Sequence, residues 1–123
     1  MSKVSPNLDE INAMRKAAPP GPVVMLNLMK FRADGGQEAY AEYMKVVGTI
    51  VDGLGVEPLY AGMAGKDFAA GEEWDMVLLA RYPNFEAFAN LMTHPTYVNE
   101  AIPHRETALE KAMLMMTQPM DLL

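Results

Sequence analysis

Apolar and polar positions along the chain alternate in short blocks separated by turn residues. Residues 7–18 carry apolar side chains at helical spacing, and Asn7 with Glu10 resembles a capping box, so we expect a helix there. Pro19, Pro20 and Gly21 must end it. Residues 23–31, VVMLNLMKF, have the length and composition of a strand, and a turn signal follows at 33–36.

The clearest helix covers residues 37–54. Its apolar side chains form one stripe made of Tyr40, Tyr43, Met44, Val47, Ile50, Val51 and Leu54. Two further strands are expected over 57–65 and 74–82. Asn84 can then cap a helix that presents Phe85, Phe88 and Met92 on one face.

The last part of the chain contains two prolines in a helical pattern. Pro95 suits the first turn of a helix, whereas Pro103 cannot continue one undisturbed, so we expect a kink or break near residue 102. Residues 112–118 give a final strand that Pro119 ends.

The predicted order is a helix followed by β-α-β-β-α-β, which is the split arrangement of ferredoxin-like folds. We therefore expect an α+β fold with a four-stranded antiparallel sheet and one extra N-terminal helix. All of 1–123 forms a single domain in this interpretation, with a core over about 22–119 and the helix over about 7–18.

The predicted strands are apolar at positions of both parities, whereas a sheet wetted on one side alternates apolar with polar residues. Two helices cover only one face. We therefore expect a homodimer in which the second face of the sheet is buried against another copy. Six of the 12 methionines fall in the three predicted strands at 23–31, 74–82 and 112–118 and suit adaptable packing on both faces.

Composition mainly excludes classes of function. The chain has no Cys, so disulfides, thiolate nucleophiles and cysteine metal sites are excluded. A formal charge of −6 argues against a nucleic-acid partner. The first residues lack the pattern of a secretory signal, and no apolar run approaches the roughly 20 residues of a membrane span, so we expect a cytoplasmic protein.

Familiar catalytic motifs are missing from the sequence. It has no GxGxxG, P-loop, GxSxG or HExxH pattern. His94 and His104 are ten residues apart with no acidic partner at ligand spacing, so we expect neither a metal site nor a cofactor. His94 suits a helix cap or the surface.

Several segments together resemble one known family. VVMLNLMKF, AYAEYM, YAG, WDMVLLARYPNFEAF, HPTY and HRETALE occur in an order and spacing similar to the domain-of-unknown-function family "thirteen-thirty" of the dimeric α+β barrel superfamily. The resemblance covers about Pro22 to Pro119 and implies a homodimer whose two sheets close into a barrel. The superfamily includes cofactor-free monooxygenases, muconolactone isomerases and haem-binding chlorite dismutases, so the resemblance implies no single reaction.

Asn27 and Arg81 are the candidate ligand contacts on strands. Asn27 is an amide in an apolar strand, so it either contacts a ligand in the barrel interior or is satisfied by neighbouring groups. Arg81 shares a strand face with Asp75, about 20 Å away, too far for the two to pair. Its guanidinium either binds a carboxylate or forms a dimer or surface salt bridge.

The helix around Pro103 holds the candidate catalytic residues. Tyr97 and Arg105 are about two helical turns apart and match a Tyr and an Arg that recur in the family pattern. With His104 as an acid or base, they suit the polarisation and protonation of an oxygenated substrate. The structural alternative is that Tyr97 and Arg105 tie the helix to the sheet. Tyr43, on the stripe of the main helix, is a ligand contact or a core residue with its hydroxyl at the edge.

These residues support two functional hypotheses of different classes. In the first, the homodimer binds a small metabolite in its barrel cavity, in a small pocket between sheet and helices, and acts as a cofactor-free oxygenase or isomerase-like enzyme. The pocket in this hypothesis is lined by Asn27, Arg81, Tyr97, His104 and Arg105. In the second, it is a non-catalytic ligand-binding or stress-associated protein. A purely structural dimer with a filled barrel is the third interpretation.

Overall fold

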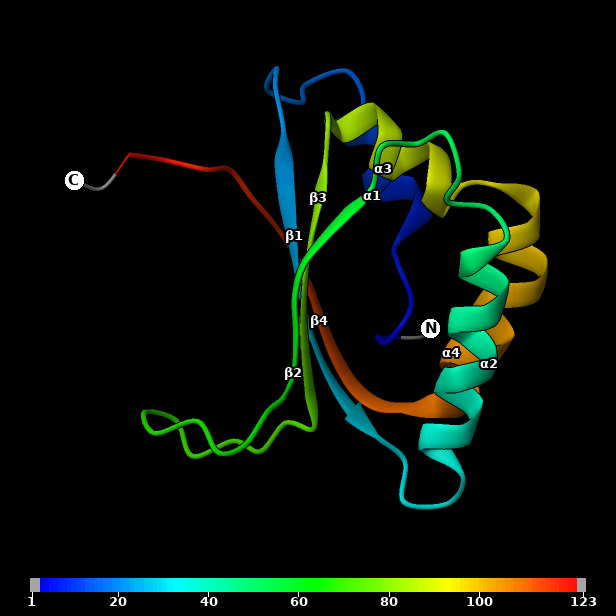
Figure 1. Cartoon of the computed structure of the whole chain (residues 1–123), viewed down its shortest axis with the longest axis vertical. Helices are drawn as coiled ribbons and strands as arrows, with labels where there is room; N and C mark the ends of the chain where they lie inside the picture. The colour runs from blue at the N-terminus through cyan, green and yellow to red at the C-terminus, as the bar shows by residue number, and fades with distance from the viewer. Residues whose placement is uncertain (1–2, 122–123) are drawn as a thin grey trace.

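The computed structural model describes residues 3–121 and contains one antiparallel sheet with its helices on one side (Figure 1). The strands are β1 (Val23–Phe31), β2 (Glu57–Met63), β3 (Met76–Tyr82) and β4 (Leu109–Thr117). The helices are α1 (Leu8–Met14), α2 (Gly36–Gly48), α3 (Phe85–Met92) and α4 (Ile102–Ala108), with a π-helical turn η1 (Tyr97–Ala101) directly before α4. The sheet order is β2-β3-β1-β4, so the expected α+β arrangement with an antiparallel sheet is confirmed.

The two faces of the sheet have different surroundings. Side chains of one parity of β1 point toward the helices, and Val23, Met25 and Met29 are fully buried there. The opposite parity lies on the face that no helix covers, which we call the open face, and its residues are half-buried. Because both parities are apolar, the open face is an apolar surface.

Side-chain caps begin the first and third helices where the sequence predicts them. Asn7 accepts a hydrogen bond from the backbone N–H of Glu10 at 3.1 Å, and Asn84 accepts one from Ala87 at 2.8 Å. Each cap satisfies one of the backbone N–H groups that a helix start leaves unpaired. Among residues 3–121, no helix is long and apolar enough to cross a membrane.

Three predicted boundaries are wrong by several residues. The helix expected over 7–18 ends at Met14, and the last strand begins at Leu109 instead of residue 112. The helix expected over 37–54 ends at Gly48, because the Thr49 hydroxyl binds the carbonyl of Val46 at 2.7 Å and competes with the backbone. A glycine at the last helical position further weakens its continuation.

Pro103 changes the type of helix without breaking it. Residues 95–108 stay helical, but the turn before Pro103 widens into the π turn η1. Pro103 has no N–H to give to the carbonyl four residues earlier, and a π turn is a common way to absorb such a defect. The kink or break expected near residue 102 is therefore a local widening.

Gly36, at the start of α2, allows a close approach between α2 and the end of α4. A Cβ atom there would lie 2.7 Å from the carbonyl oxygen of Ala108 and 3.0 Å from the Cβ of Phe31. At Gly48, at the other end of α2, no described atom lies within 4 Å of such a Cβ.

We therefore expect Gly36→Ala to lower the free energy of unfolding by about 1–3 kcal/mol, because backbone atoms must move apart. The same change at Gly48, the matched control, should raise it by up to about 1 kcal/mol, because alanine is the better helix former. Denaturant titration of both variants measures the difference, and equal effects would contradict this packing.

Candidate functional site

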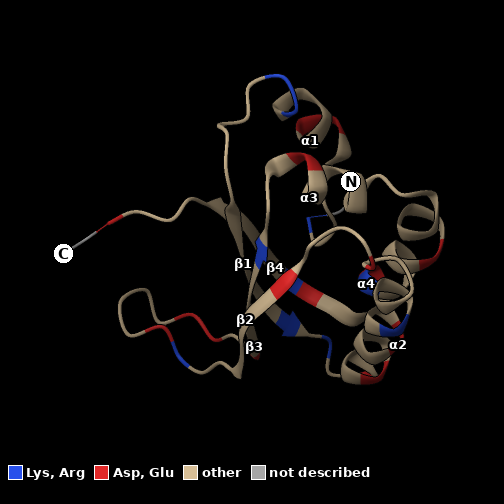
Figure 2. Cartoon of the chain, turned by 45° about the horizontal axis from the view of Figure 1, so that its top comes forward, with Lys and Arg blue, Asp and Glu red and all other residues tan. Residues whose placement is uncertain are grey.

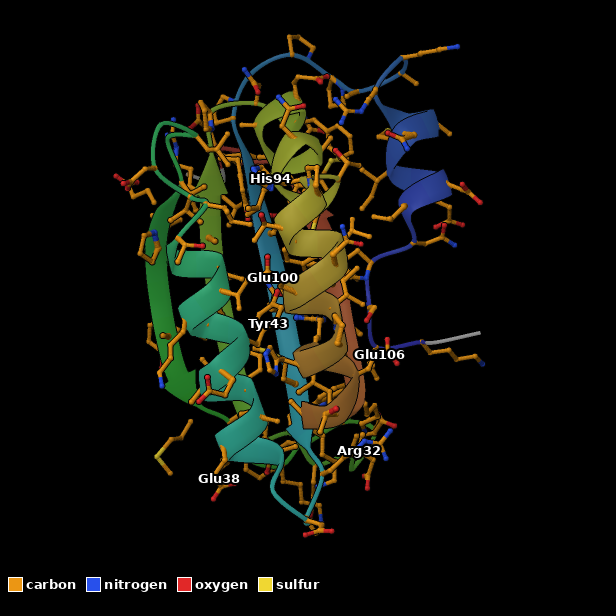
Figure 3. All side chains as sticks on the ribbon, turned by 90° about the vertical axis from the view of Figure 1, so that its right-hand side faces the viewer. Arg32, Glu38, Tyr43, His94, Glu100 and Glu106 are labelled. Carbon is orange, nitrogen blue, oxygen red and sulfur yellow. The ribbon has the colours of Figure 1, made fainter. Side chains whose placement is uncertain are left out.

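A cavity of about 250 Å³ lies between the helix-covered face of the sheet and the helices α2, α3, η1 and α4. Most of its wall is apolar, including Met25, Val47, Leu78, Ala80, Phe88 and Leu114. Figure 3 shows the cavity side of the molecule with α2 and the η1–α4 segment in front of the sheet. The cavity is therefore separated from the open face by the sheet itself.

Three polar side chains meet on the wall of this cavity. The hydroxyls of Tyr43 and Tyr97 are 2.8 Å apart, and Nη1 of Arg105 donates to the Tyr43 hydroxyl at 3.4 Å. The guanidinium carbon of Arg105 also lies 5.4 Å from the centroid of the Tyr43 ring. We call these three residues the Arg–Tyr cluster. The structure thus brings together three of the six site residues predicted from the sequence.

Arg105 is buried without a carboxylate among the described residues. It is 2% exposed, its Nε donates to the carbonyl of Val4 at 2.6 Å, and its Nη2 has no hydrogen-bond partner within residues 3–121. The ion pairs found there involve other cations: Arg15 with Glu86, Lys45 with Glu42, and Lys111 with Glu72. A buried positive charge is thus left uncompensated at the cavity, which is costly unless something else pairs with it.

The π turn helps to aim Tyr97 and Arg105 in one direction. Eight residues of an ideal α-helix, at about 100° each, overshoot two full turns by about 80°. A π turn holds more residues per turn, so η1 reduces this overshoot and both side chains reach the cavity wall. The local disturbance caused by Pro103 therefore has a consequence for the site.

Burial sets the charge states around the cavity. Burial first, and the neighbouring Tyr43 second, raise the pKa of Tyr97, Tyr40 and Tyr82 well above the usual value of a phenol. For Arg105, burial lowers the pKa but the nearby tyrosines raise it, and the result lies above its ordinary value. At neutral pH these three tyrosines keep their hydroxyl protons, and the guanidinium is a cation.

Asn27 also lines the cavity, from β1, and it points toward the helices on the parity of Met25 and Met29. The side-chain amide of Asn27 makes no hydrogen bond to any residue within 3–121, so this group is free to contact a ligand. The sequence places Asn27 in a pocket between the sheet and the helices, and its position in the structure agrees with this, while the open face carries the opposite parity of β1.

Arg81 and His104 lie away from the cavity wall. Arg81 is on the open-face parity of β3, opposite Val24 of β1 and Glu57 of β2. His104 is half-buried on α4 and does not line the cavity. His94 serves as a cap, because its Nδ1 accepts a hydrogen bond from the backbone of Thr96 at 3.0 Å.

Two tyrosines of the cavity wall have no functional role in the predictions from the sequence. Tyr40 lay on the predicted apolar stripe and Tyr82 at the end of a predicted strand, and both line the cavity. Tyr82 lies two residues after Ala80 on the same strand, so the alternation of a strand predicts that both side chains lie on one face. Within residues 3–121, no group of three His, Asp or Glu side chains is placed to hold a metal ion.

Comparison with solved structures identifies relatives of this chain. The crystal structure of the methylated RPA0582 protein shares 31% sequence identity, covers 97% of this chain and 96% of that chain, and has a TM-score of 0.82. The chain belongs to the RPA0582 family. A second structure of RPA0582, described as a protein of unknown function from Rhodopseudomonas palustris, shares 28% identity, covers 98% and 99% of the two chains, and has a TM-score of 0.84.

More distant structures share the fold of the RPA0582 family. A dimeric protein of unknown function with a ferredoxin-like fold from Bacteroides fragilis is 17% identical, covers 79% of this chain and 95% of its own, and has a TM-score of 0.56. A dabb family protein with a ferredoxin-like fold from Mesorhizobium loti is 11% identical, covers 82% and 99%, and has a TM-score of 0.54. These similarities confirm the ferredoxin-like fold.

No family model and no curated protein matches the chain. The solved structures confirm the ferredoxin-like fold expected from the sequence, whereas the resemblance to the "thirteen-thirty" family and to its superfamily stays a prediction.

The buried phenols predict a loss of stability at high pH. Tyrosines of the unfolded chain ionise near pH 10, whereas Tyr40, Tyr82 and Tyr97 of the folded chain keep their protons to higher pH, so folding binds protons. The free energy of unfolding should therefore fall as pH rises above about 10, by up to about 4 kcal/mol per pH unit.

Denaturant titrations between pH 9 and 11 measure this slope. Tyr82→Phe should reduce it by about a third, because one of three buried phenols is removed. Tyr60→Phe is the control, because Tyr60 is 56% exposed, and it should leave the slope unchanged. A stability independent of pH in this range would show that the phenols are not shielded as described.

Proposed function

We propose that this chain binds a small, largely apolar metabolite in the cavity between the sheet and the helices, and that it does so as a homodimer. The observation that carries the proposal is the division of the cavity wall. Apolar side chains form most of it, while Asn27 and the Arg–Tyr cluster supply a few convergent polar groups. Such a combination is typical of small-molecule sites, where apolar area provides affinity and polar groups fix orientation.

The volume of the cavity limits the size of the ligand. At about 250 Å³ it lies just below the roughly 300–1,000 Å³ of sites for drug-sized molecules. A nucleotide or a larger cofactor therefore does not suit this cavity. A metabolite of about one ring or a short chain does.

Binding is better supported than acid–base catalysis. Among residues 3–121, the cavity wall carries tyrosines, an asparagine and an arginine, but no His, Asp, Glu or Lys. His104, the acid or base expected from the sequence, does not line it. A cofactor-free oxygenase or isomerase-like reaction is the second candidate, because the Arg–Tyr cluster suits the stabilisation of an enolate. Such a reaction requires a substrate that loses its proton readily, since the described part of the wall offers no strong base.

The open face supports the homodimer. It carries Val24, Leu26, Leu28, Val77, Leu79 and Met115. The charged residues of the strands, which Figure 2 draws in blue and red, all lie within three positions of a strand end, so the middle positions of each strand are uncharged. The loop between β2 and β3 and the chain after β4 also project on this side, away from the helices (Figure 1). A second copy covering this face would remove a large apolar patch from water.

Titration with benzene, followed by amide NMR shifts, tests the cavity. We expect saturable shifts in residues around the cavity, since an apolar cavity binds benzene. Ala80→Phe should abolish them, because Ala80 is 7% exposed and lines the wall. The control Ala41→Phe, on the exposed side of α2, should bind as the parent does. Unchanged binding of benzene by the Ala80→Phe variant, or no binding of benzene by the parent chain, would contradict the proposal.

Sedimentation equilibrium at micromolar concentration tests the homodimer. The parent chain should sediment at twice its 13.6 kDa. Leu79→Lys should sediment as a monomer, because an unpaired charge at the centre of the open face opposes burial. Thr49→Lys, at an exposed site beyond the end of α2, is the control and should stay dimeric. A monomeric parent, or a dimeric Leu79→Lys variant, would contradict the proposed interface.

A further inference from the structure

We infer that the ligand of the cavity is a small monoanion, with its charge on oxygen atoms that Arg105 and the tyrosine hydroxyls hold, and with an apolar body. This inference rests on the proposed binding function and adds the chemical class of the ligand. It follows from the number of hydrogen-bond donors in the Arg–Tyr cluster, from its charge and from its position in the cavity.

The Arg–Tyr cluster has more donors than acceptors. Tyr43 and Tyr97 have two hydroxyl protons between them, and one is used in the hydrogen bond that joins the hydroxyls. The second proton has no acceptor within residues 3–121. Nη2 of Arg105 adds protons that are likewise unused. A ligand that completes the cluster must therefore supply acceptors, as carboxylate, enolate and phenolate oxygens do.

The charge of the Arg–Tyr cluster further limits the chemical class of the ligand. Arg105 is a cation that is 2% exposed, and no described carboxylate lies within 4 Å of its guanidinium. A neutral carbonyl or a water molecule would accept hydrogen bonds but would leave this charge uncompensated in an apolar cavity. An anion satisfies the donors and the charge together, and hydrogen bonds between charged groups are about twice as strong as neutral ones.

The exposure of the wall orients the ligand. Met44, Gly48 and Pro58 are exposed wall residues, and they lie on α2 and β2 at the edge of the molecule. Tyr97 and Arg105 are 1% and 2% exposed at the closed end. The anionic group of the ligand therefore lies at the closed end of the cavity, beside Arg105. The apolar body of the ligand extends toward Met44 and Val47 and passes the side-chain amide of Asn27.

Calorimetric titration with benzoate and with benzamide tests the inference, because the two probes have nearly the same shape and differ in charge. Benzoate should bind the parent chain at least tenfold more tightly than benzamide. Arg105→Met should remove this preference. Arg32→Met is the control, because Arg32 is exposed and outside the cavity, and it should keep the preference.

Tyr97→Phe provides a second variant in case Arg105→Met does not fold. It removes one hydroxyl donor and should weaken benzoate binding about fivefold to tenfold, and weaken it more than it weakens benzene binding. If benzene binds but benzamide binds as tightly as benzoate, the inference is overturned and the proposed cavity function stands. If none of the three probes binds, both are overturned.

Discussion

The buried guanidinium of Arg105 is the interaction on which the organisation of the site depends. It connects the N-terminal segment, through the carbonyl of Val4, with α2, through the hydroxyl of Tyr43, and Tyr43 in turn contacts Tyr97 of η1. Elements far apart in the sequence therefore converge on one cation. Because burying a charge is costly, its position at the wall of an apolar cavity requires a compensating gain, and the bound anion that we propose would provide one.

The two faces of the sheet have separate roles in this account. One face and its helices enclose the cavity, and the open face is available to a second copy. Apolar residues at both parities of each strand serve both purposes, which explains the many methionines in the strands. Substitution on one face can thus change assembly while the cavity stays intact.

Much of the fold was predictable from local pattern. β1 was predicted at its observed limits, and the caps at Asn7 and Asn84 were read from residue type. The spacing of Tyr97 and Arg105, together with their match to the family pattern, predicts that the two share a helix face. Sequence did not reveal that Arg81 faces away from the helices or that His104 leaves the cavity wall, because strand register and helix rotation are set by tertiary packing.

The most direct measurement is a crystal structure of the chain with benzoate bound. We expect a carboxylate oxygen at about 2.7–3.1 Å from a guanidinium nitrogen of Arg105 or from the Tyr97 hydroxyl, with the ring toward Met44. A carboxylate at the mouth of the cavity, with the ring against Arg105, would contradict the account.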